Sequence, residues 1–205
     1  MPARHLFAPG LVIAALVASI AGCSDRPARV PAPQINPAAI VEAVFGQADA
    51  DGDGSLRATE QQTVPAIAAG ASRLDADGDA GVDREELRAW LEAVLDSRVA
   101  IAPLQIIMTH RGRPLTGVEV RIVPEPFMGG EVKAAEGTTD ADGAAAMTIS
   151  DAQYAGVNCG LYRVEITGTG NDGKPLAVAV NTDSPLGVAV GAGIPEAGFV
   201  QLAVD

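Results

Sequence analysis

The sequence predicts an α+β fold in separate domains, in which a helical N-terminal part is followed by an antiparallel β-sandwich. Apolar residues recur at helical spacing between residues 37 and 98, whereas from about residue 102 they alternate with polar residues. The formal net charge of the 205 residues is -12, and residues 36–98 alone contain 13 acidic and five basic side chains. The two parts therefore differ in both secondary structure and charge.

The composition excludes several classes of protein. A hydrophobic content of 48% is too high for a wholly disordered chain. The excess of acidic residues argues against a nucleic-acid-binding protein, because such proteins present basic surfaces to phosphates. Two cysteines exclude a disulfide-dense scaffold.

The N-terminus has the features of an export signal. A basic start precedes an apolar stretch at residues 11–20, which is too short to span a bilayer as a helix. The following residues 20–23 read Ile-Ala-Gly-Cys, which resembles the lipobox of bacterial lipoproteins. This resemblance implies that residues 1–22 are removed as a signal peptide and that Cys23 carries a lipid anchor. Ser24 then favours the outer membrane, and the alternative is an ordinary signal peptide without lipid.

A proline-rich segment follows the lipidation site. Four prolines lie between residues 27 and 37, so residues 23–36 are predicted to form an extended tether of about 3.1 Å per residue. If Cys23 is lipidated, Cys159 has no partner in the chain. Cys159 is predicted to be a buried small residue in a strand, and a reactive thiol is the alternative.

Residues 37–98 are predicted to be helical. Asn36 can cap a helix that has Pro37 at its first position, and Pro65 divides residues 58–73 into two short helices. A further helix is predicted at residues 83–98. The apolar faces of the first and last helices comprise Ile40, Val41, Val44, Phe45 and Ala48, and Leu87, Trp90, Leu91, Val94 and Leu95.

Two acidic loops of twelve residues separate these helices. Loop one (residues 49–60) has Gly54 at position 6, which permits a sharp turn, and an apolar Leu56 at position 8. Its positions 1, 3, 5, 7 and 12 are occupied by Asp49, Asp51, Asp53, Ser55 and Glu60. This pattern matches the calcium loop of the EF-hand family, and the resemblance implies that these five residues bind Ca²⁺ through oxygen atoms.

Loop two (residues 75–86) starts 26 residues after loop one and follows the same pattern. The residues that the EF-hand resemblance makes metal ligands are Asp75, Asp77, Asp79, Gly81, Asp83 and Glu86. The departures are Ala80 at position 6, where the family has glycine, and Arg57 at position 9 of loop one. Either departure could weaken a site, so one or two calcium ions are expected.

The remaining residues, 102–205, are predicted to form the sandwich from short strands. These strands are expected at residues 104–108, 118–123, 144–149, 161–167, 176–181, 187–190 and 199–204. The turns at residues 112–120 and 139–143, and the Gly160-x-Tyr162-x-Val164 strand, resemble prealbumin-like domains, including carboxypeptidase regulatory-type repeats. This resemblance implies a binding or spacer module.

No enzymatic activity is expected. His110 is the one histidine left after removal of the signal peptide; it is predicted to lie exposed in a turn and has no recognisable catalytic partner. The expected function is calcium binding by an exported, membrane-anchored lipoprotein of the cell envelope, with calcium in a structural role. Two alternatives stay open: a calcium-dependent module that docks an envelope protein, as dockerin-like modules do, and a sandwich that binds an envelope polysaccharide.

Overall fold

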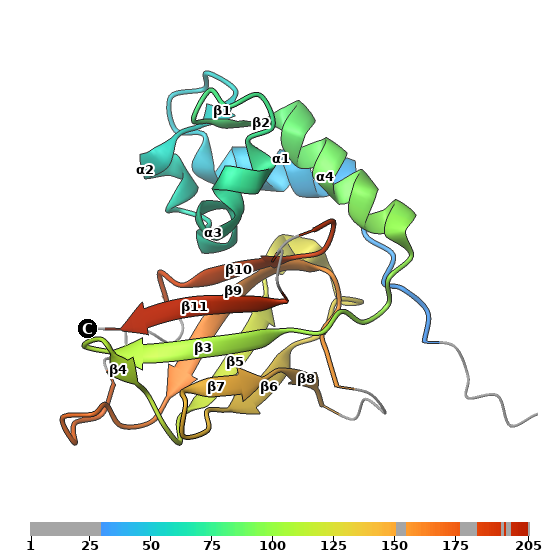
Figure 1. The fold of residues 1–205 in the computed structure, drawn as a ribbon. Helices are drawn as coiled ribbons and strands as arrows, with labels where there is room; N and C mark the ends of the chain where they lie inside the picture. Colours follow the sequence, from blue (N-terminus) through green and yellow to red (C-terminus); the bar gives the residue numbers. More distant parts are fainter. Residues whose placement is uncertain (1–29, 151–154, 177–183, 194, 196–197, 205) are drawn as a thin grey trace, which may run out of the picture.

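The computed structural model describes residues 30–150, 155–176, 184–193, 195 and 198–204. A group of short helices lies over one side of a two-sheet β-sandwich (Figure 1). The helical part consists of α1 (Pro37–Ala48), β1 (Ser55–Leu56), α2 (Ala58–Gln61), α3 (Pro65–Leu74), β2 (Val82–Asp83) and α4 (Arg84–Ser97). The predicted signal peptide and Cys23 lie outside the described residues.

The helices begin and end where the sequence predicts. The Asn36 side chain accepts a hydrogen bond of 3.2 Å from the Ala39 amide, which caps α1 in front of Pro37. All five predicted apolar residues of α1 are buried, as are four of the five on α4; Leu95 is half-buried. Pro65 begins α3, as expected for a proline at the first helical position.

Two sheets form the sandwich. The five-stranded sheet has the order β10-β9-β5-β6-β8, and the other has the order β11-β3-β4, with β7 also paired to β3. The strands are β3 (Gln105–His110), β4 (Arg113–Pro114), β5 (Glu119–Pro124), β6 (Ala135–Thr138), β7 (Ala144–Ala146), β8 (Thr148–Ile149), β9 (Gly160–Thr167), β10 (Gly187–Val190) and β11 (Phe199–Val204); the 3-10 helix η1 (Pro126–Met128) follows β5.

The strand predictions hold with three differences. The expected strand at residues 144–149 is divided at Met147, because β7 pairs with β3 in one sheet and β8 pairs with β6 in the other. Strands β4 and β6 were not predicted, and β4 lies among residues that were expected to form a turn. The pairing is antiparallel except between β11 and β3, which run parallel, so the expectation of a purely antiparallel sandwich is wrong for this pair. Most of the strand expected at residues 176–181 lies outside the described residues.

The helical part packs directly on the sandwich. Helix α3 contacts β10 and β9, and all four residues of β10 are buried because the sandwich core covers one face and the helices cover the other. The Cβ of Ala189 lies 3.1 Å from where a Cβ would stand at Gly70 of α3. The Trp90 indole of α4 donates a 3.2 Å hydrogen bond to the Gly191 carbonyl. The buried apolar residues of both parts form one cluster, so the two parts share a core where the sequence predicted separate domains.

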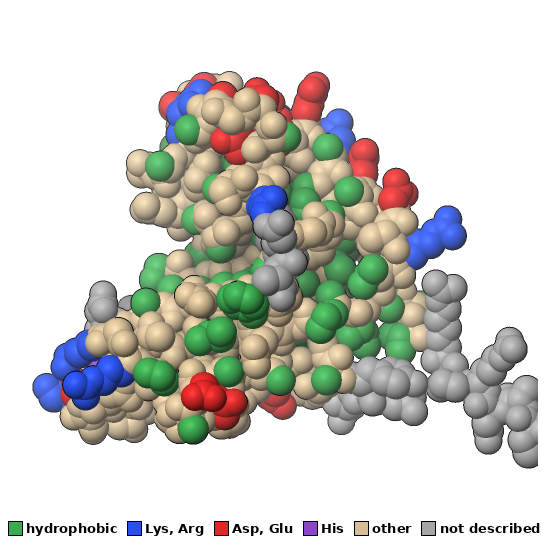
Figure 2. All heavy atoms as spheres, viewed as in Figure 1, with side chains coloured by type: hydrophobic (Ala, Val, Ile, Leu, Met, Phe, Trp, Pro, Cys, Tyr) green, Lys and Arg blue, Asp and Glu red, His purple; other side chains and the backbone are tan. Residues whose placement is uncertain are grey.

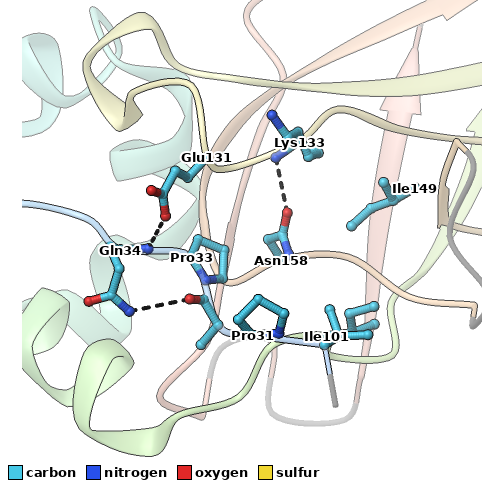
Figure 3. Close-up of a pocket in the computed structure, with 10 residues that line it drawn as sticks. Pro31, Pro33, Gln34, Ile101, Glu131, Lys133, Ile149 and Asn158 are labelled. Carbon is cyan, nitrogen blue, oxygen red and sulfur yellow. Dashed lines mark hydrogen bonds between the residues drawn. The ribbon is translucent and has the colours of Figure 1, made fainter. Parts of the chain in front are cut away.

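The end of the predicted tether also lies against the body. Residues 30–36 form no helix or strand, and the Gln34 amide donates a hydrogen bond to a Glu131 carboxylate oxygen (Figure 3). Residues 30–34 line a hollow of about 630 Å³, together with Ile101, Ile149 and neighbouring side chains. Residues 30–34, at the end of the predicted tether, therefore lie against the folded body instead of extending away from it.

A Gly187→Ala substitution tests the helix–sheet contact. A Cβ at Gly187 would collide with the backbone of Pro65 and Ala66 at the start of α3. We expect this overpacking to lower the free energy of unfolding by about 1–3 kcal/mol, measured by thermal and chemical denaturation. Gly46→Ala is the matched control, because Gly46 lies in α1 with open space around it and alanine favours helix. Equal stability of the two variants would contradict this packing.

Candidate metal centre

The two acidic loops lie side by side at one end of the helical part. Each loop connects two helices: Asp49 is the C-cap of α1, and Asp75 is the C-cap of α3. Strands β1 and β2 pair antiparallel between the loops, with Leu56 opposite Val82 and both side chains fully buried. Leu56 and Val82 each occupy position 8 of their loop, so the apolar residue at this position joins the two loops. Figure 2 shows acidic side chains gathered over this end of the molecule and along α4.

In loop one, three carboxylates converge. Oxygen atoms of Asp49, Asp51 and Asp53 all lie within 4.8 Å of one another. The loop backbone turns around these side chains: Asp49 Oδ1 accepts a 2.9 Å bond from the Gly52 amide, and Asp53 Oδ1 accepts a 2.8 Å bond from the Ser55 amide. Three of the five predicted residues are therefore brought together at one point.

Glu60 closes loop one from α2. Its Oε1 accepts a 2.8 Å hydrogen bond from the Ala50 amide, and its Oε2 accepts a 3.1 Å bond from the Arg57 amide. These amides hold the pKa of the Glu60 carboxyl below its usual value, so the group is ionised at neutral pH. Glu60 lies outside the group of three converging aspartates.

In loop two, the converging set is Asp75, Asp77 and Glu86, whose oxygen atoms lie within 4.8 Å of one another. Glu86 also accepts a 2.7 Å bond from the Ala76 amide. Asp79 and Asp83 lie outside this set. Asp83 instead caps α4 and accepts bonds of 2.8 Å from the amides of Glu85 and Glu86.

Ala80 takes the left-handed backbone conformation that glycine takes in loop one. Its φ is 69°, compared with 84° for Gly54 at the same loop position. An alanine held there costs about 1–2 kcal/mol more than a glycine would. The backbone at Ala80 itself therefore carries this strain.

The remaining two predicted residues meet between the loops. Gly81 faces Ser55, and a Cβ at Gly81 would collide with the Ser55 Oγ atom. That hydroxyl is buried and has no hydrogen-bond partner among the described residues. Both residues were predicted as ligands through their carbonyl groups, and Gly81 is also the residue that allows the loops to approach.

The donor chemistry of both loops fits a hard divalent cation. All the converging atoms are carboxylate oxygens, which calcium and magnesium prefer and which are poor ligands for soft metals. In addition, the Arg57 side chain lies between Asp53 of its own loop and Asp79 of loop two. The contact of Arg57 with Asp79 was not predicted, because it depends on the pairing of β1 with β2.

The prediction that His110 is exposed is wrong. Its side chain is 3% exposed, and Nδ1 accepts a 2.8 Å hydrogen bond from the Asn171 amide. The turn that contains Asn171, far away in sequence, covers the end of β3, and the local pattern around residue 110 gives no sign of it. Cys159 is buried as predicted, but it lies directly before β9 and not within a strand; burial raises the pKa of its thiol.

Sequence analysis also missed one buried acid. Glu125 is 6% exposed between β5 and η1, and its amide donates a hydrogen bond to the Leu161 carbonyl. Burial raises the pKa of the Glu125 carboxyl, whereas the positive charge of Arg163 acts to lower it. Within the described residues, no helix has the length and apolar character needed to cross a bilayer.

Comparison with known proteins adds little. No protein-family model matches the chain, and no curated protein matches it. Among solved structures, a variant of BcpA, the major pilin subunit of Bacillus cereus, matches with 15% sequence identity and a TM-score of 0.32. The match covers 51% of this chain and 29% of that chain. A similarity this low carries no functional argument.

An Ala80→Gly substitution tests the backbone strain in loop two. Glycine removes the penalty for positive φ, so we expect the free energy of unfolding of the metal-free protein to rise by about 1 kcal/mol. Ala76→Gly is the control in the same loop, since Ala76 has no positive φ and glycine there only adds freedom to the unfolded chain. Chemical denaturation should therefore give shifts of opposite sign, and shifts of the same sign would refute the strain.

Proposed function

We propose that this protein is an exported, lipid-anchored calcium-binding protein of the cell envelope, in which loop one and loop two form an EF-hand pair. The observation that carries the proposal is the convergence of three carboxylates in each loop, within 4.8 Å, at the ends of paired helices. A solvated acidic surface would gain nothing from such convergence, because like charges at this distance repel. Bound calcium would supply two positive charges to each loop.

Different residues of each loop would supply the oxygen ligands of the bound ion. In loop one, Asp49, Asp51 and Asp53 offer carboxylate oxygens, while the Ser55 carbonyl and Glu60 complete the oxygen shell. In loop two, Asp75, Asp77 and Glu86 already lie together, and Asp79 and the Gly81 carbonyl lie in the same loop. Asp83 caps α4, so in that position it would act only through water.

We propose that the role of calcium is structural. The helical part has an excess of eight acidic over basic side chains, most of them in the loops and on α4. Neutralising the loops would relieve repulsion in the segments that position α3 and α4 on the sandwich. Calcium sites outside the cytoplasm have dissociation constants of about 10⁻⁴–10⁻³ M and can stay filled where calcium is plentiful.

We further propose a prealbumin-like sandwich that serves as a binding or spacer module. This assignment is supported by two glycines in the turns that resemble those of prealbumin-like domains. Gly117 and Gly143 both have positive φ, and a Cβ at Gly143 would lie 2.5 Å from the Met108 carbonyl oxygen. Thr139 is buried, and its hydroxyl accepts a 3.0 Å bond from the Val118 amide. These features belong to the fold, so they name no ligand.

Calcium titration tests the metal proposal. We expect metal-free protein to bind calcium in two events by calorimetry, with a rise in melting temperature that chelation reverses. Glu60→Gln and Glu86→Gln should each weaken one event by more than about tenfold, because an amide cannot supply two carboxylate oxygens. Trp90, on α4, can report the change by fluorescence because its indole contacts the sheet at Gly191.

The matched control for these two substitutions is Asp142→Asn, which removes one acidic charge from the exposed turn between β6 and β7. It should leave both binding events intact. Absence of binding at millimolar calcium would overturn the metal proposal, and an unchanged melting temperature on chelation would overturn the structural role.

Mass spectrometry of the protein extracted from bacterial membranes tests the anchor. The lipoprotein proposal predicts a chain that starts at Cys23 and carries acyl groups, and Cys23→Ala should abolish both processing and membrane retention. Cys159→Ala is the matched control and should be lipidated normally, because Cys159 is buried in the folded body. An unmodified Cys23 in the exported protein would leave only an ordinary signal peptide.

A further inference from the structure

Arg57 connects the two acidic loops through their aspartates at position 5. Its Nε lies 3.9 Å from Asp53 Oδ2 in its own loop, and a terminal guanidinium nitrogen lies 3.5 Å from Asp79 Oδ2 in the other loop. The guanidinium also donates a 3.3 Å hydrogen bond to the Asp79 carbonyl. One cation thus contacts equivalent positions of both loops.

The fold dictates this arrangement. Arg57 follows β1 directly, and the pairing of β1 with β2 brings loop two alongside. The Arg57 amide is already used by Glu60, so the side chain alone is free to reach across. The guanidinium suits this task because its planar fork can serve two oxygen acceptors at once.

We propose that Arg57 is a built-in counter-ion of the metal-free loops, and that calcium must compete with it at Asp53 and Asp79. This inference rests on the proposed calcium function. In the metal-free protein the guanidinium offsets repulsion between the loops. When calcium is bound, the same positive charge lies close to two divalent ions and opposes them. Arg57 therefore lowers calcium affinity and links the occupancy of one loop to the other.

This role predicts that removal of the Arg57 guanidinium has opposite effects on the stability of the metal-free protein and on calcium affinity. Removing the guanidinium should destabilise the metal-free helical part, because Asp53 and Asp79 lose their shared partner. It should also tighten calcium binding. The three side chains are about half exposed, so each ion pair is weak and screened by salt. An increase in calcium affinity of roughly three- to tenfold is the size that two such pairs allow.

Arg57→Ala is the test, with Arg88→Ala as the matched control. Arg88 is exposed on α4 in the same acidic part, so its removal changes the net charge equally. Calorimetric titration of metal-free protein with calcium should give a three- to tenfold lower dissociation constant for Arg57→Ala and less than a twofold change for Arg88→Ala. The difference should shrink in 0.5 M potassium chloride. Arg57→Lys should fall in between, because a lysine ammonium lacks the fork.

Melting temperatures add a second readout. Without calcium, Arg57→Ala should melt below Arg88→Ala, and at saturating calcium that order should disappear or reverse. The wild-type protein could bind calcium while Arg57→Ala binds it no more tightly than Arg88→Ala. That result would overturn the counter-ion role and leave the calcium proposal intact. Failure of the wild-type protein to bind calcium would overturn both, so the two failures are distinguishable.

Discussion

The arrangement of the helical part depends on the short antiparallel contact between Leu56 and Val82. These two side chains are fully buried between loops that carry most of the acidic residues of this part. Apolar burial of this kind favours the contact by roughly 1.5–3 kcal/mol for each side chain, whereas the surrounding carboxylates oppose it. The pairing therefore holds the aspartates close together against their repulsion, and this concentration of charge is what makes a divalent cation a suitable ligand.

The same constraint extends to the sandwich. Helix α3 lies between loop one and loop two in the chain, and its N-terminal turn sits directly on Gly187 of β10. Trp90 connects α4, which leaves loop two, to Gly191 at the end of the same strand. Any change in the conformation of the loops is thus transmitted to two helices that share a core with the sheet. A metal in these loops would stabilise more of the molecule than the loops themselves.

Local sequence signals were sufficient for most elements because each has a local physical cause. Asn36 and Pro37 start α1, Pro65 starts α3, and the periodicity of apolar residues assigns their buried faces. The positions of the two acidic loops were likewise predictable, since the spacing of their acidic residues is a property of a single twelve-residue segment. The strand at residues 135–138 escaped prediction because its sequence, Ala-Glu-Gly-Thr, has neither alternation nor β-branched bulk until Thr138.

The sequence by itself determined the helices, the acidic loops and the succession of strands, because hydrogen-bonding caps, turn residues and apolar periodicity act over a few neighbouring positions. Only the tertiary structure decided the parallel pairing of β11 with β3, the burial of His110 by Asn171, and the position of Arg57 between Asp53 and Asp79. Each of these three features joins segments more than 20 residues apart. Contacts between distant segments depend on how the sheets and helices pack together. The sequence pattern within one segment does not indicate such contacts.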